Sequence, residues 1–245
     1  MFVASNMYVR GYKMWQKKIK KTLFTLNINN NYDKELTDLT YPYLKHYAHK
    51  MGADFHVITE RKFPDYPVTY EKLQIYELSQ QMENDWNIFI DCDALIHPDL
   101  MDITVHLPFD HVAHFGEDIA SYRWIYDKYF LRDGRHIGSC TWFIVASSWN
   151  TELWKPIDDM TLDEIEASIL PIRKEILNGI TPLRLIEDYV MSRNIAKYGL
   201  KYMSFDTILN KFNQTADGLV YHRYMMPDEE KIVRLKTQMK AWNLL

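Results

Sequence analysis

One short run of residues constrains the fold of this 245-residue chain more than any other feature. The segment from Trp86 to Ile96 is apolar and is interrupted by Asp91 and Asp93. It is too short for a membrane-spanning helix, which needs about 18 or more apolar residues. Its length and composition fit a strand that is buried on both faces. Such strands occur in sheets with helices on both sides, so the run predicts a layered α/β protein.

The rest of the chain alternates strand-like and helix-like patterns, which supports this interpretation. The helix expected at 33–51 has apolar residues on one face and ends at Gly52. The other elements are expected as strands at 21–28, 54–59, 111–115, 141–146 and 201–205, and as helices at 70–82, from 181 to 199, and from 227 onward. This order predicts a mainly parallel central sheet flanked by helices. Ligands of such sheets bind beyond the carboxyl ends of the strands.

Composition narrows the class of protein further. Disorder is excluded as the main state, because 47% of the residues are hydrophobic and 14% are aromatic. The net charge of −4 excludes a global basic field for nucleic acid. The charge is uneven, however, because residues 1–32 contain six Lys or Arg and no acid. We therefore expect a basic N-terminal segment at 1–20 followed by one domain at 21–245.

Several function classes can be set aside on the cysteine count and the missing motifs. Two cysteines, Cys92 and Cys140, cannot build a disulfide scaffold or a four-cysteine zinc site. They favour a reduced, cytoplasmic protein, and the sequence has no run long enough for a membrane span. A Walker-type phosphate loop and a Gly-x-Gly-x-x-Gly motif are both missing from the sequence, which excludes NTPase and dehydrogenase interpretations.

The acidic pair near the end of the apolar run predicts a metal site. In an extended chain, Asp91 and Asp93 point to the same side. Two like charges beside a hydrophobic strand repel each other and are costly to desolvate. A divalent cation relieves that cost, and oxygen ligands suit Mg²⁺ or Mn²⁺. The alternative is a strand that ends in two solvated acids.

At this point the sequence resembles the GT-A class of metal-dependent nucleotide-sugar glycosyltransferases, which have a Rossmann-like single domain and an Asp-x-Asp motif after a central strand. The galactosyl- and xylosyltransferase-like branch is the most similar. The resemblance covers about residues 21–235 and is carried by these segments: 25–27, 47–55, 70–73, Trp86, 91–96 and 138–139.

The resemblance implies a set of donor-binding residues. Thr25 and Asn27 would contact the nucleotide base and ribose, and Tyr32 would stack on a uracil-like base. Lys72 would reach ribose or phosphate, and Arg223 would face the diphosphate. The remaining donor residues would be Asp91 at the ribose and Gly138 and Ser139 at the sugar. Each has a plain alternative, such as a packed tyrosine or a solvated helix lysine.

The same resemblance implies metal-binding and catalytic residues. His222 would join Asp91 and Asp93 as the third protein ligand of Mn²⁺ or Mg²⁺, the alternative being a histidine at a sheet edge. Asp188, with Glu187 second, would face the acceptor and would act as the general base in an inverting enzyme. Adjacent helix residues diverge by about 100°, so we expect one of the two carboxylates to point into the cleft.

These features predict a glycosyltransferase that moves a hexose or pentose from a nucleotide-diphosphate sugar, with UDP favoured, to an acceptor hydroxyl. The default acceptor is a bacterial surface glycan, and the enzyme itself is expected in the bacterial cytoplasm. A phage-type enzyme acting on a modified DNA base, in the cytoplasm of the host, is an alternative that the basic segment supports. A non-catalytic sugar-nucleotide-binding relative is a third hypothesis. A nucleotidyltransferase is disfavoured, because residues 25–30 lack a glycine-rich signature.

Overall fold

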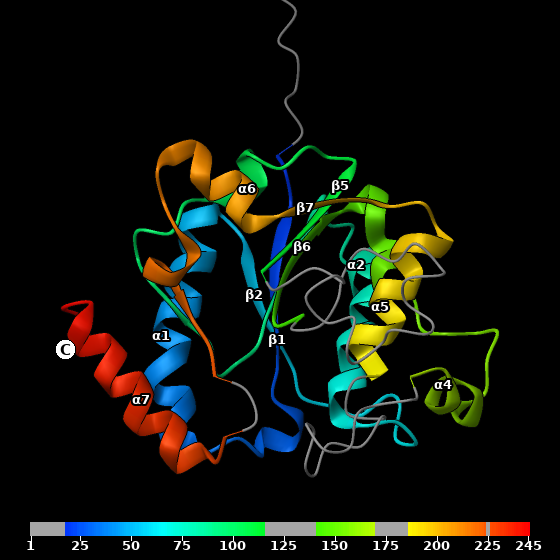
Figure 1. Cartoon of the computed structure of the whole chain (residues 1–245), viewed down its shortest axis with the longest axis horizontal. Helices are drawn as coiled ribbons and strands as arrows, with labels where there is room; N and C mark the ends of the chain where they lie inside the picture. Colours follow the sequence, from blue (N-terminus) through cyan, green and yellow to red (C-terminus); the bar gives the residue numbers. More distant parts are fainter. Residues whose placement is uncertain (1–17, 116–140, 170–185, 224–225) are drawn as a thin grey trace, which may run out of the picture.

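Six strands form the central sheet, in the order β2-β1-β3-β6-β5-β7 (Figure 1). The computed structural model describes residues 18–115, 141–169, 186–223 and 226–245. The strands are β1 (Lys21–Leu26), β2 (Asp54–Ile58), β3 (Trp86–Ile90), β5 (His111–Phe115), β6 (Phe143–Ser147) and β7 (Lys201–Ser204). β1 pairs in parallel with β2 and β3, β5 pairs in parallel with β7, and β6 is antiparallel to both of its neighbours. The prediction of a mainly parallel sheet is therefore confirmed.

Helices cover both faces of the sheet (Figure 1). α1 and α7 lie on one side, whereas α2, α4 and α5 lie on the other. The α-helices are α1 (Lys34–Met51), α2 (Ile75–Gln81), α4 (Leu162–Ile169), α5 (Ile186–Lys197), α6 (Phe205–Leu209) and α7 (Asp228–Ala241). The 3₁₀ helices are η1 (Ile28–Asn30), η2 (Val68–Gln74), η3 (Ile103–Val105), η4 (Ser148–Trp154), η6 (Asn210–Phe212) and η7 (Ala216–Gly218).

Each face of the sheet contributes to its own apolar core, as the alternation of a doubly buried strand requires. On β1, Phe24 belongs to the cluster that packs against α2 and α5, while Leu23 belongs to the cluster on the α1 side. The same alternation holds on β3, where Phe89 and Ile88 belong to the two opposite clusters. The buried sheet thus gives β3 a rigid frame up to the residue before Asp91.

The local signals at the two ends of α1 are those that the sequence predicted. The Asp33 carboxylate caps the helix by accepting a hydrogen bond of 2.7 Å from the backbone N–H of Glu35. Gly52 ends the helix in a left-handed conformation, with φ of 66°, that a residue without Cβ adopts at no steric cost. These two signals fix the bounds of α1, which contacts the candidate site described below.

The apolar run from Trp86 to Ile96 is not one continuous strand, which corrects the prediction. β3 ends at Ile90, the chain turns at 91–94, and Leu95–Ile96 forms β4 in a separate sheet. β4 pairs in antiparallel register with β8 (Val220–Tyr221). The expected helix at 70–82 is also divided, because residues up to Gln74 form the 3₁₀ helix η2 and only the rest is α-helical.

Some predictions fall on parts of the chain outside the described residues. These parts include residues 1–17 of the basic segment, the two donor-site residues Gly138 and Ser139, and Cys140. Among the residues that the structure describes, no helix has the length and apolar character needed to cross a membrane.

Candidate metal and donor site

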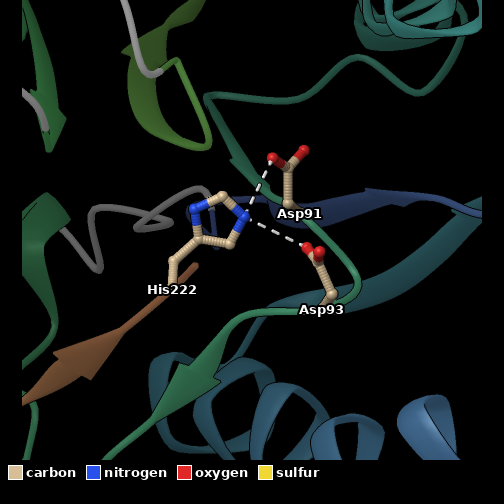
Figure 2. Close-up of side chains that lie close together, drawn as sticks. All are labelled: Asp91, Asp93 and His222. Atoms are coloured by element: carbon tan, nitrogen blue, oxygen red, sulfur yellow. Dashed lines mark ion pairs between the residues drawn. The ribbon is translucent and has the colours of Figure 1, made fainter. Parts of the chain in front are cut away.

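Asp91, Asp93 and His222 lie together at the carboxyl end of β3 (Figure 2). The imidazole points at both carboxylates: its Nε2 lies 3.2 Å from Oδ1 of Asp93 and 3.7 Å from Oδ2 of Asp91. One ligand atom of each side chain lies within 4.8 Å of the others. The structure therefore brings together the three side chains that were predicted to bind a metal.

A tight turn, and not an extended strand, places the two aspartates. The backbone N–H of Ala94 donates to the carbonyl of Asp91 at 3.1 Å, and the N–H of Asp91 donates to the carbonyl of Trp142 at 2.8 Å. The hydroxyl of Thr40 on α1 donates to the carbonyl of Cys92 at 2.5 Å. The turn is thus tied both to the start of β6 and to α1. The prediction that Asp91 and Asp93 point to the same side because the chain is extended there was therefore wrong.

The small sheet of β4 and β8 delivers His222 to this turn. Leu95 pairs with Tyr221 and Ile96 with Val220, so His222 follows directly on the strand beside the turn. The indole of Trp142 stacks on the imidazole, with ring centroids 4.8 Å apart and an interplanar angle of 25°. This stacking limits the rotation of the ring and leaves its Nε2 facing the carboxylates.

One buried and one partly buried ammonium group hold the aspartates from the far side. Lys72 of η2 places its Nζ 3.2 Å from Oδ1 of Asp91, and Lys231 of α7 places its Nζ 2.5 Å from Oδ2 of Asp93. Burial raises the pKa of Asp91, and Lys72 and His222 oppose that shift. Burial also acts on Asp93, but the contacts with His222 and Lys231 outweigh it and lower the pKa of this carboxyl.

The two acidic residues at the start of α5 approach the same region and are both buried. Glu187 Oε1 lies 3.8 Å from the Nζ of Lys72, and its Oε2 accepts a 2.7 Å hydrogen bond from Thr69. Burial raises the pKa of Glu187 to about 7 despite the attraction of Lys72. Asp188 Oδ1 accepts hydrogen bonds from the hydroxyl and the backbone N–H of Thr141, at 2.6 and 3.2 Å.

Of the residues predicted to contact the nucleotide, Tyr32 lies at a cavity. Tyr32 lines a cavity of about 150 Å³ together with Ile28, Asn31, Val68 and Asp228. The Nζ of Lys231, which pairs with Asp93, lies 5.8 Å from the centroid of the Tyr32 ring, so the tyrosine lies close to the carboxylate cluster. The cavity therefore adjoins the candidate metal site.

Thr25 and Asn27 support this region from beneath. The hydroxyl of Thr25 is fully buried and has no hydrogen-bond partner in the described part of the chain. Asn27 is also buried, and its amide oxygen accepts from the backbone N–H of Tyr32 at 3.3 Å while its nitrogen donates to Tyr41 at 3.1 Å. Asn27 thus shapes the loop that carries Tyr32.

Arg223, the last predicted donor residue among those described, is exposed and does not join the cluster. Its guanidinium lies over the ring of Tyr221, 4.9 Å from the centroid. It follows His222 directly in the chain, so it lies at the rim of the site.

Sequence reasoning missed three residues that organise the site: Lys231, Trp142 and Thr40. The turn at the start of α7 was visible in its three acidic residues, but no sequence pattern shows that this helix packs with Lys231 toward Asp93. Trp142 and Thr40 act through contacts between elements far apart in the chain, which periodicity does not reveal. The sequence offered one usable signal for Lys231: it lies in the first turn of a helix that follows the candidate metal ligand His222.

The donor set of this cluster fits a divalent cation. Two carboxylates and one imidazole supply the oxygen and nitrogen atoms that Mg²⁺ and Mn²⁺ accept from proteins. The side chains come from the turn after β3 and from the end of β8, and their ligand atoms lie within 4.8 Å of one another. Asp91, Asp93 and His222 would hold the ion.

No family model and no curated protein matches the sequence. Solved structures with a similar course of the chain exist. A glycosyltransferase involved in the glycosylation of the major capsid of PBCV-1 has 11% identity and a TM-score of 0.49, over 88% of this chain and 98% of that one. The galactosyltransferase LgtC, crystallised with donor and acceptor sugar analogues, has 10% identity and a TM-score of 0.45, over 90% and 99%.

Proposed function

We propose that this chain is a metal-dependent glycosyltransferase of the GT-A type, which moves a sugar from a nucleotide-diphosphate sugar to an acceptor hydroxyl. The observation that carries the proposal is the convergence of Asp91, Asp93 and His222 at the carboxyl end of β3, beside a cavity lined by Tyr32. In sheets of this kind, ligands bind at that end of the strands. A cavity with an aromatic wall next to a cation site suits a nucleoside joined to a diphosphate.

The residues around the cluster have complementary roles in this proposal. Tyr32 stacks on the base, for which we propose uracil, and Asn27 keeps the tyrosine loop in place. Arg223 brings positive charge to the rim where the diphosphate departs, and Lys72 and Lys231 add positive charge from behind the two aspartates. Mn²⁺ or Mg²⁺, when bound, supplies Lewis-acid neutralisation of the leaving diphosphate.

Two carboxylates are candidates for the general base that takes the proton from the hydroxyl of the acceptor. Asp188 is the first candidate, and the hydrogen bonds from Thr141 fix its orientation. Glu187 is the second, and its pKa of about 7 suits proton transfer near neutral pH. Asp188→Asn and Glu187→Gln separate the two, because loss of the base lowers kcat and leaves donor affinity nearly unchanged.

We propose a surface glycan as the acceptor class. A transfer assay separates this proposal from DNA modification: the enzyme receives the donor together with either glycan oligomers or hydroxylated DNA. Transfer to DNA that weakens steeply with salt would instead assign a role in nucleic-acid binding to the basic segment 1–20.

The test of the metal and donor site is Asp93→Asn in the full chain. We expect calorimetry of UDP-sugars with Mn²⁺ to lose its binding signal, because one ligand charge disappears at the centre of the cluster. Asp38→Asn is the matched control, since Asp38 is an exposed acid on α1 paired with Lys34. Metal-dependent hydrolysis of the sugar nucleotide by the unmodified protein separates an enzyme from a binding relative. Donor binding that survives Asp93→Asn unchanged contradicts the proposal.

A further inference from the structure

The two ligating aspartates share a pattern in how their oxygens are used. In Asp91, Oδ1 contacts Lys72 at 3.2 Å and Oδ2 faces His222 at 3.7 Å. In Asp93, Oδ2 contacts Lys231 at 2.5 Å and Oδ1 faces His222 at 3.2 Å. Each carboxylate therefore has one oxygen held by a lysine and the other turned toward the imidazole. The two lysines come from η2 and α7, which are distant in the sequence.

The side chains of both lysines are largely shielded from solvent, Lys72 fully buried and Lys231 partly buried. Their side chains are only 5% and 11% exposed for Lys72 and Lys231. A buried ammonium that leaves its carboxylate becomes an uncompensated charge in a poorly solvated place. The other acids within reach are farther away: Glu187 lies 3.8 Å from Lys72, and Asp228 lies 3.9 Å from Lys231. An entering cation thus meets carboxylates whose second oxygens are already engaged.

The number of oxygens that a carboxylate offers decides which cation it suits. Ca²⁺ takes about six to eight oxygen ligands and accepts both oxygens of one carboxylate, whereas Mg²⁺ requires near-octahedral coordination and keeps several waters. We propose that Lys72 and Lys231 each withhold one oxygen of a ligating aspartate and thereby make the site select Mg²⁺ or Mn²⁺ over Ca²⁺. This inference rests on the metal site of the proposed function, and it assigns Lys231 as a specificity-determining residue.

The selectivity prediction separates this role from a simple charge effect. Removal of one ammonium near the site raises the affinity for every divalent cation to a similar extent, because the charge of the ions is the same. Release of an Asp93 oxygen helps Ca²⁺ more than Mg²⁺, because only Ca²⁺ accommodates the additional ligand readily. The ratio of the two affinities therefore reports on the withheld oxygen.

The experiment measures dissociation constants of Mg²⁺, Mn²⁺ and Ca²⁺ for the full chain by calorimetry, without any donor. The variants are Lys231→Met, Lys231→Arg and the control Lys236→Met. The control removes the same charge from the same helix, at an exposed position paired with Glu35. We expect Lys231→Met to shift the ratio of affinities at least tenfold toward Ca²⁺. Lys231→Arg keeps a donor on Asp93 and should behave as the unmodified protein, as should Lys236→Met.

Each other outcome has a definite meaning. A ratio that stays within twofold in a folded Lys231→Met variant overturns the inference and leaves the proposed metal site standing. An unmodified chain that binds no divalent cation overturns both. Should Lys231→Met fail to fold, a crystal structure of the unmodified chain soaked with Mn²⁺ replaces it. One oxygen from each aspartate on the ion supports the inference, and a bidentate Asp93 overturns it.

Discussion

Thr40 links helix α1 to the turn that carries Asp91 and Asp93, and the removal of its hydroxyl tests how that turn is held. The hydroxyl donates to the Cys92 carbonyl at 2.5 Å, and both residues are buried. Thr40→Val keeps the shape of the side chain but leaves this carbonyl without its donor. An unsatisfied buried acceptor costs about 1–3 kcal/mol. The second contact of the hydroxyl, to the carbonyl of Leu36 at 3.2 Å, adds little, because that carbonyl is already in the helix.

Urea denaturation of Thr40→Val measures this cost, with Thr37→Val as the matched control. Among the described residues, the hydroxyl of Thr37 donates to carbonyls at the start of the same helix, at 3.1 and 3.4 Å, so its loss should change stability by less than about 0.5 kcal/mol. Thr40→Ser keeps the donor and should recover most of the loss. The affinity for Mn²⁺ should fall in Thr40→Val as well. Equal stability of the two valine variants would refute the idea that this hydrogen bond anchors the turn.

Two further predictions concern buried carboxylates. Because the pKa of Glu187 is raised from 4.5 to about 7, the folded protein keeps a proton that the unfolded chain releases, and stability should fall by up to about 3 kcal/mol as pH rises through that window. Thermal unfolding across this range should show a flatter profile for Glu187→Gln, and parallel profiles would contradict the assignment. Arg61→Met should destabilise the protein by about 3 kcal/mol, because fully buried Glu71 loses its 2.7 Å ion pair. Lys62→Met breaks an exposed pair with Glu77 and should cost under about 1 kcal/mol in the same denaturation assay.

Local signals in the sequence were sufficient to predict much of the layered fold. A capping aspartate at 33 and a glycine at 52 act on their own backbone, so the bounds of α1 follow from neighbouring residues alone. The doubly buried character of β3 follows from its unbroken apolar side chains for the same reason. Antiparallel β6 was not predicted, because the direction of a strand in a sheet depends on connections and packing, which a single run does not encode.

The sequence predicted the three side chains that converge at the candidate site and one of the residues that hold them, Lys72, but not the others. Asp91, Asp93 and His222 were found, because two of them lie in a recognisable run and the third follows from a family resemblance. Lys231 and Trp142 belong to elements that reach the cluster through long-range packing, and the β4–β8 pairing joins segments more than a hundred residues apart. The pattern of one segment does not report which distant segment completes it.

The pairing of β4 with β8 also sets the order in which the site is assembled during synthesis. Asp91 and Asp93 are synthesised at least 129 residues before His222 and Lys231. Protein synthesis proceeds at about 5–20 residues per second, so the two carboxylates have Lys72 at hand but wait several seconds or longer for His222 and Lys231. A nascent chain can hold β1, β2 and β3 long before it holds a cation site. The group of Asp91, Asp93 and His222 is therefore complete only once β8 has paired with β4.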